Sequence, residues 1–139
     1  MRVLLDTCVI LDALESRQPF SKDAEELFLA AANNLFTGCI TAKASTDIYY
    51  LMHRHTHSDK ASREVLNKLF SLFEVVDTAG MDCRRAIPSP VLDFEDAVMI
   101  ETAARTEVDY IVTRNIKDFA RSSVSILAPK DFLTKLMTE

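Results

Sequence analysis

Four aspartates interrupt or border the apolar segments of this 139-residue sequence. Asp6 breaks the apolar run "VLLDTCVILD", Asp118 follows the apolar segment "YIVT", and Asp96 lies in "DFEDAVMI". Asp47 lies inside a segment with helical spacing, beside its apolar stripe rather than opposite it. Burying an unpaired carboxylate is costly, so each aspartate either caps a turn or helix or holds a cation or a proton. Several carboxylates around one crevice would repel one another, and a divalent cation with oxygen ligands relieves that repulsion.

Each aspartate also has an ordinary structural explanation when it is taken alone. Asp6 is a candidate helix N-cap, and Asp96 is a first-turn residue favoured by the helix dipole. Asp118 is a candidate turn residue before Phe119. Asp47 is harder to explain in this way, because aspartate is a poor helix former in the middle of a helix. The positions of the four residues in the fold therefore decide between a capping role and a metal site.

Short apolar segments alternate with amphipathic ones along the whole chain. The sequence predicts strands at 2–5, 35–40, 74–77, 110–113 and 124–127. Helices are expected between them, including one over residues 9–14, one capped by Thr41 and one that starts at Asp93, and a last helix is expected from Pro129. The strands are apolar rather than alternating in polarity, which is typical of a parallel sheet covered on both faces. We therefore predict a single α/β domain over residues 1–139, with a central parallel sheet in a three-layer α/β/α arrangement.

The predicted sheet places two of the aspartates together. Segments 2–5 and 110–113 should be adjacent or nearly adjacent inner strands, because both are apolar and both end in polar residues. Asp6 and Asp118 would then lie at one edge of the sheet. In open α/β sheets, functional groups collect outside the carboxyl ends of the strands.

The composition is that of an ordinary globular chain with an acidic charge balance. Hydrophobic residues make up 48% and charged residues 27%, and the net charge is −5. This balance argues against a general polyanion-binding surface, although carboxylates can still bind phosphates through divalent metals. No apolar run approaches the roughly 20 residues that span a bilayer, and the N-terminal run is too short for a signal peptide. The three cysteines are widely spaced and fit reduced thiols, so we expect a cytoplasmic protein without a membrane anchor.

Three segments of the sequence together resemble a known family. In chain order they are "VLLDTCVILDAL", "DFEDAVMIETAA" and "DYIVTRNIKDF". They are similar to the PIN domain, specifically to its bacterial group of VapC-type toxins, and the resemblance covers nearly the whole chain. On this match the four acids of the family fall on Asp6, Asp47, Asp96 and Asp118. Each of them is a carboxylate here, although the second acid is usually glutamate in the toxins.

The resemblance implies a Mg²⁺- or Mn²⁺-dependent endoribonuclease. Oxygen ligands from the four aspartates would suit a hard cation, which activates water and stabilises charge on a phosphate. Thr113 and Asn115 match the polar pair that supports the last acid in the family. Cys8 occupies a place where asparagine or serine is common, and we expect it to pack beneath the site. Implied partners are an RNA substrate, a second copy of the chain in a homodimer, and an antitoxin protein.

One arginine and a group of three histidines outside this quartet are further candidates for function. Arg114 lies beside the predicted site and is a candidate contact to the RNA backbone. His53, His55 and His57 alternate in "MHRHTH", and they fit either an exposed helix end or a transition-metal site.

Two other classes of protein share some of these features. A receiver-type phosphoacceptor domain would need an acid pair near the first strand and a late lysine, and only Asp6 is found there. A catalytically inactive PIN scaffold that binds RNA or a protein partner is the remaining alternative.

Overall fold

The computed structural model describes residues 1–138, and its centre is a five-stranded parallel sheet. The strand order is β3-β2-β1-β4-β5. The strands are β1 Arg2–Leu5, β2 Thr37–Thr41, β3 Glu74–Val76, β4 Tyr110–Val112 and β5 Ser125–Leu127. The predicted parallel sheet is confirmed, and β1 and β4 are direct neighbours with Val3 opposite Tyr110. This order differs from the 2-1-3-4-5 order of receiver-type domains.

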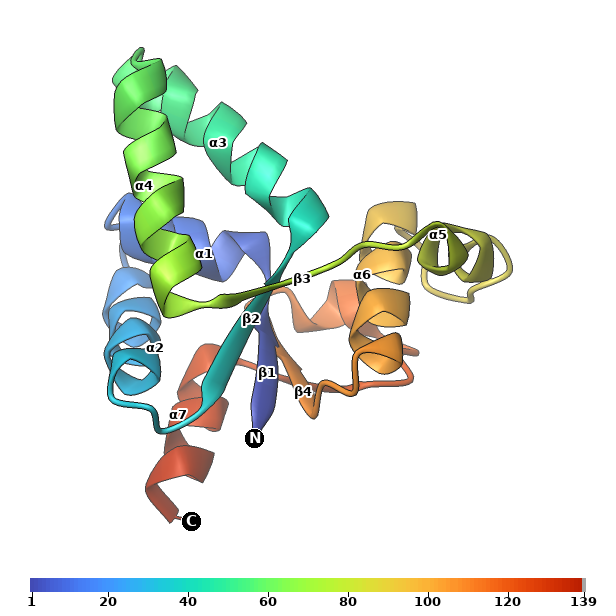
Figure 1. The fold of residues 1–139 in the computed structure, drawn as a ribbon. Coiled ribbons are helices and arrows are strands. Elements are labelled where there is room, and N and C mark those ends of the chain that lie inside the picture. The colour runs from blue at the N-terminus through green and yellow to red at the C-terminus, as the bar shows by residue number, and fades with distance from the viewer. Residues whose placement is uncertain (139) are drawn as a thin grey trace.

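Helices cover both faces of the sheet, which gives the predicted α/β/α layers (Figure 1). One layer consists of α1 Thr7–Leu14, α2 Ser21–Ala32, α3 Ala42–Thr56, α4 Asp59–Leu72 and α7 Pro129–Thr138. The other contains α5 Gly80–Ala86 and α6 Phe94–Arg105. Alternation along β1 explains the two cores, because Val3 and Leu5 pack into the first while Leu4 packs into the second.

Helix caps fix two helices at the carboxyl edge of the sheet. Thr41 ends β2, and its hydroxyl accepts a hydrogen bond of 3.0 Å from the Ala44 N–H, so α3 begins directly at that edge. Asp93 caps α6 in the same way, accepting 2.9 Å from the Asp96 N–H. The sequence predicted both caps. The first turns of α3 and α6 therefore lie where the strands end.

Some element boundaries differ from the sequence prediction. Helix α1 begins at Thr7 rather than two residues later, because the Asp6 carbonyl accepts from the N–H groups of Val9 and Ile10. Leu35 belongs to the turn that closes α2 and not to β2, since its N–H donates to the Ala30 carbonyl. A short 3₁₀ helix, η1 Ile116–Phe119, follows β4 where a simple turn was expected.

A buried ion pair fastens α5 to α6. Asp82 is 1% exposed, and it accepts from Arg105 Nε at 2.8 Å and from the Thr102 hydroxyl at 2.8 Å. The hydrogen bonds from Arg105 lower the pKa of Asp82 to about 2, in spite of its burial. The network holds α6, which carries Asp96, against the rest of its layer.

Two simpler expectations concern membranes and cysteines. Within residues 1–138 no helix combines the length and apolarity that crossing a membrane requires. Cys8, Cys39 and Cys83 are all free thiols.

Candidate active site

Asp6 lies at the end of β1 and begins the site. Its N–H continues the ladder with β4 by donating to the Val112 carbonyl at 3.0 Å, and its side chain is buried. The Thr113 hydroxyl donates to the Asp6 carboxylate at 2.8 Å, and the Cys8 thiol lies 3.4 Å from the same oxygen. Burial raises the pKa of Asp6, and the bonds from Thr113 and Cys8 oppose that rise. Cys8 thus packs against the first acid, as expected.

Asp96 is the most strongly perturbed acid of the site. It lies in the first turn of α6, with its side chain half-buried. Burial raises its pKa to about 7, and repulsion from Asp93, Asp6, Asp118 and Glu95 adds to the rise. Without a cation, this carboxyl group therefore titrates near neutral pH rather than in the usual range of an aspartate.

A cavity of about 340 Å³ opens beside these residues, and we call it the acidic cavity. Asp6, Asp47, Glu95 and Asp96 line it, together with Thr7 and Met99 among others. Three of the four predicted acids thus meet around one space although they come from β1, α3 and α6. The fourth, Asp118, does not line this cavity; it lines another of about 250 Å³ that it shares with Asp93.

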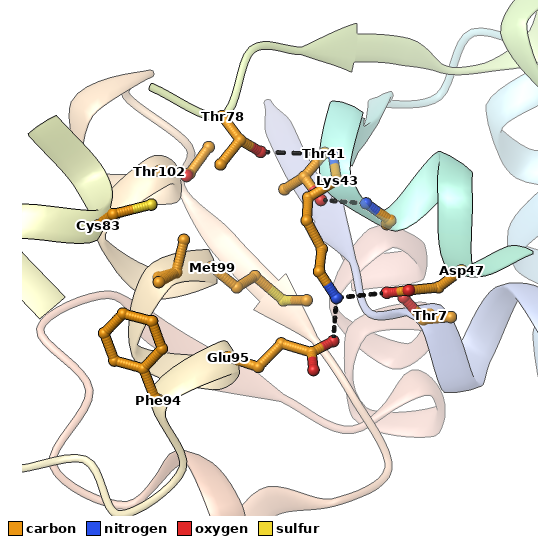
Figure 2. A pocket seen from close by; sticks show the side chains of 12 residues that line it. Thr7, Thr41, Lys43, Asp47, Thr78, Cys83, Phe94, Glu95, Met99 and Thr102 are labelled. Carbon is orange, nitrogen blue, oxygen red and sulfur yellow. Dashed lines mark hydrogen bonds and ion pairs between the residues drawn. The ribbon is translucent and has the colours of Figure 1, made fainter. Parts of the chain in front are cut away.

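Lys43 links two of the acids that line the acidic cavity. Its Nζ lies 2.7 Å from Asp47 on the same helix and 2.6 Å from Glu95 on α6 (Figure 2). Burial lowers the pKa of Lys43, but the hydrogen bonds to the two carboxylates outweigh it and the net shift is upward. The carboxylate of Asp47 is therefore neutralised by a lysine rather than exposed to the other acids.

Removal of the Lys43 charge should increase divalent cation binding. In Lys43→Met the aliphatic stem remains, while Asp47 and Glu95 lose the cation that both contact. We expect Mn²⁺ affinity, measured by isothermal titration calorimetry, to rise about two- to fivefold, which is the range of an exposed ion pair. Lys22→Met on α2 is the matched control and should leave the affinity unchanged. Equal or weaker Mn²⁺ binding in Lys43→Met would show that Lys43 does not compete with the metal.

The loop after β4 supports the first acid more directly than the last. Thr113 is fully buried, and its hydroxyl donates to Asp6 while it accepts 3.0 Å from the Asn115 N–H. The Asn115 carbonyl accepts from the Asp118 N–H at 3.0 Å, which closes the turn of η1. The Thr113 hydroxyl thus contacts Asp6, and Asn115 contacts Asp118 through its backbone carbonyl, while the support of the last acid by this pair stays a prediction.

Arg114 is held by a buried acid that the sequence did not single out. Its Nε donates to Asp12 at 2.8 Å, and its guanidinium lies 4.3 Å from the centre of the Phe20 ring. Asp12 is 2% exposed and has Arg17 at 3.9 Å as a second basic neighbour. A contact between Arg114 and RNA stays a prediction. Truncation of Arg114 would also leave Asp12 without its main partner, so loss of binding in that variant would be difficult to interpret.

The histidine segment gives no sign of a metal site in the described chain. His53 stacks on Tyr49 with ring centroids 5.8 Å apart, while His55 and His57 are exposed at the end of α3. In residues 1–138, no three His, Cys, Asp or Glu side chains are gathered closely enough to enclose a metal ion. The four aspartates Asp6, Asp47, Asp96 and Asp118 are among the side chains that are not gathered in this way.

Two residues of the site were missed from the sequence, although both left a signal. Glu95 lies between Asp93 and Asp96 in "DFED", so an acidic N-cap is followed by two acids in the first turn of α6. Lys43 precedes Asp47 by four residues on a helix, which is the spacing of a helical ion pair. Their contact with each other joins separate elements and has no local sequence signature.

The family of the chain follows from its sequence as well as from this geometry. A family model described as PIN domain matches residues 2–117. The chain belongs to the PIN domain family. No curated protein matches the sequence at a significant level.

Solved structures with the same PIN fold include several toxin–antitoxin proteins. VapBC2 from Rickettsia felis, bound to a DNA fragment from its promoter, matches with a TM-score of 0.68 and 18% identity over 92% of this chain and 98% of that one. VapBC-1 from nontypeable Haemophilus influenzae gives 0.69 and 13% identity, over 94% and 99% of the two chains. Mycobacterium tuberculosis VapC20, a sarcin-ricin loop cleaving toxin, gives 0.64 and 11% identity, over 88% and 98%. At these identities the likeness concerns the fold.

Proposed function

We propose that this PIN domain is a Mg²⁺- or Mn²⁺-dependent endoribonuclease that acts as the toxin of a toxin–antitoxin pair. The single observation that best supports the proposal is that Asp6, Asp47 and Asp96, which come from three separate elements, line one cavity. Burial and repulsion from nearby carboxylates, including Asp6 and Asp118, raise the pKa of Asp96 there. A hard divalent cation bound at the carboxyl edge of the sheet would relieve this repulsion between carboxylates.

The donor atoms present fit such a cation. Asp6, Asp96 and Asp118 offer carboxylate oxygens, the ligand type that Mg²⁺ and Mn²⁺ prefer. Mg²⁺ usually keeps several waters, so one or two of these carboxylates would be enough as direct ligands. Asp47 would act through water or orient the nucleophile, since Lys43 already contacts its carboxylate.

Other residues of the chain would position the carboxylates that bind the cation. When bound, the cation supplies an acidified water and stabilises negative charge on a phosphate. The Thr113 hydroxyl holds Asp6 in one orientation through its 2.8 Å hydrogen bond. Asp93 fixes the first turn of α6 and thereby the position of Asp96. Repulsion from the other carboxylates favours the protonated form of Asp96, and Asp96 would have to lose this proton to serve as a metal ligand.

The toxin role and its partners rest on the fold neighbours. A toxin–antitoxin complex from Klebsiella pneumoniae has the same fold, and so does VapC20, a sarcin-ricin loop cleaving toxin. We extend these properties to this chain as a proposal, with an antitoxin and a second copy of the chain as protein partners and a structured RNA as substrate. The alternative, a PIN scaffold that binds RNA without cleaving it, has the same fold and differs only in chemistry.

Cleavage of RNA in the presence of Mn²⁺ distinguishes the two possibilities. We expect the purified protein to cut at least one member of a panel of structured RNAs with Mn²⁺ or Mg²⁺. EDTA should abolish the cleavage, and excess Mn²⁺ should restore it. Binding to the same RNAs in Ca²⁺ without cleavage under any of the metals would favour the inactive scaffold.

A further inference from the structure

A second cavity, largely apolar, lies next to the acidic one. It has a volume of about 270 Å³, and we call it the apolar cavity. Phe94, Val98 and Met99 of α6 form one wall, and Cys83 of α5 and Thr78 after β3 lie around the rest (Figure 2). Phe94 is 51% exposed although it is a large aromatic side chain. An open apolar hollow of this kind suits a flat, largely apolar ligand.

The apolar cavity adjoins the acidic cavity. Thr7, Asp47, Glu95 and Met99 line both. Lys43 lines the apolar cavity, and its Nζ bonds to Asp47 and Glu95 at this junction. Anything that places a phosphate at the acidic cavity therefore has its neighbouring chemical groups within reach of the apolar one.

We propose that the apolar cavity holds one nucleobase of the RNA strand that is cut, beside the scissile phosphate. This proposal rests on the ribonuclease function proposed above and specifies its substrate as RNA with an unpaired base at the cut. RNA-binding proteins commonly recognise splayed-out bases by stacking them on aromatic side chains. The half-exposed Phe94 ring at the opening provides such a surface. A cavity smaller than the roughly 300–1,000 Å³ typical of drug-sized ligands suits a single base.

Polar groups in the wall would orient the base. The Thr78 hydroxyl accepts from the Lys43 N–H at 3.4 Å, and within residues 1–138 it donates to no other residue. Its proton is thus available for an acceptor on the edge of a base. The Thr102 hydroxyl is different, since it already donates to Asp82 at 2.8 Å. Thr78 is therefore the side chain that would influence which base is preferred.

An abasic scan tests the proposal. The cut in an RNA cleaved by the wild-type protein with Mn²⁺ is mapped, and each flanking nucleotide is then replaced in turn by an abasic one. We expect one position to lower kcat/KM by roughly tenfold, within the range of a lost base–aromatic stack. In Val98→Phe, which fills the cavity, the intact RNA should be cut more slowly, and the same abasic change should have no further effect.

Two further variants guard against loss of folding. Phe94→Ala removes an exposed ring without filling the core, and it should reduce the abasic effect in the same way. Leu29→Phe on α2, which is 63% exposed, is the matched control and should behave like wild type. Thermal unfolding of each protein checks that the fold is kept. A 2-aminopurine at the sensitive position should change its fluorescence on binding in Ca²⁺ with wild type and not with Val98→Phe.

The outcomes separate this proposal from the proposed function. If wild type cuts RNA and no abasic position matters, or if Val98→Phe and Phe94→Ala respond like wild type, the cavity takes no base and this proposal is overturned. That result would leave an antitoxin side chain as the occupant to examine. If wild type cuts no RNA with any divalent metal, the ribonuclease function fails first and the base site fails with it.

Discussion

Asp96→Asn should lower the single-turnover rate of RNA cleavage by well over tenfold while the protein remains folded. The amide has the shape of the carboxylate but neither its charge nor its affinity for a hard cation. Because Asp96 is crowded by Asp93, Asp6, Asp118 and Glu95, removal of its charge also removes repulsion. The free energy of unfolding should therefore stay the same or increase, so a lower rate cannot be ascribed to misfolding.

The measurement is cleavage of a susceptible RNA with Mn²⁺ and enzyme in excess, with a parallel binding titration in Ca²⁺. Asp131→Asn is the matched control, since Asp131 also lies in the first turn of a helix, α7, but far along the chain from the site. It should cleave at the wild-type rate. If Asp96→Asn cleaves as fast as wild type, the carboxylate cluster is not the active site and the nuclease proposal should be abandoned.

The positions of the acids in the fold were predictable because they depend on local sequence. Apolar segments identified β1 and β4, and their polar ends placed Asp6 and Asp118 at one edge of the sheet. Thr41 and Asp93 marked the starts of α3 and α6, and so located Asp47 and Asp96. Strand ends and helix caps are encoded within a few residues, which is why the β1–β4 pairing and the two helix starts are confirmed, while the role of the four acids as one site stays a prediction.

The partners of the charged side chains were not predictable in the same way. Lys43 contacts Glu95 across 52 residues of sequence, and Arg114 contacts Asp12 across 102. Such pairs depend on how helices pack and on side-chain rotamers, neither of which leaves a periodic signal. Arg114, for example, was predicted to contact RNA, but in this structure its guanidinium is bonded to the buried carboxylate of Asp12.

Metal-free protein should lose stability as the pH rises, and Mn²⁺ should restore it. The pKa of Asp6 is raised by burial, and that of Asp96 is raised to about 7. In the unfolded chain both return to about 4, so the folded state binds more protons between these values. The contribution of Asp96 to stability is fully present below about pH 4 and is lost as the pH rises through about 7, and the contribution of Asp6 is likewise lost as the pH rises. Wild type in EDTA should therefore melt at a lower temperature at pH 8 than at pH 5.

Asp6→Asn should reduce both the loss of stability at high pH and the stabilisation by Mn²⁺. The substitution removes one buried carboxylate and part of the repulsion on Asp96, while the amide oxygen can still accept a hydrogen bond from Thr113.

The size of the Mn²⁺ effect follows from mass action. At pH 8 and with Mn²⁺ at about 100 times Kd, wild type is stabilised by about 2.7 kcal/mol, or roughly 8 to 10 °C in Tm. At pH 5 the rise should be smaller, since Asp96 must first release a proton. Differential scanning calorimetry of both proteins, with and without Mn²⁺, measures these shifts. An equal rise in Asp6→Asn would mean that the metal binds elsewhere, and the segment from His53 to His57 would be the first place to examine.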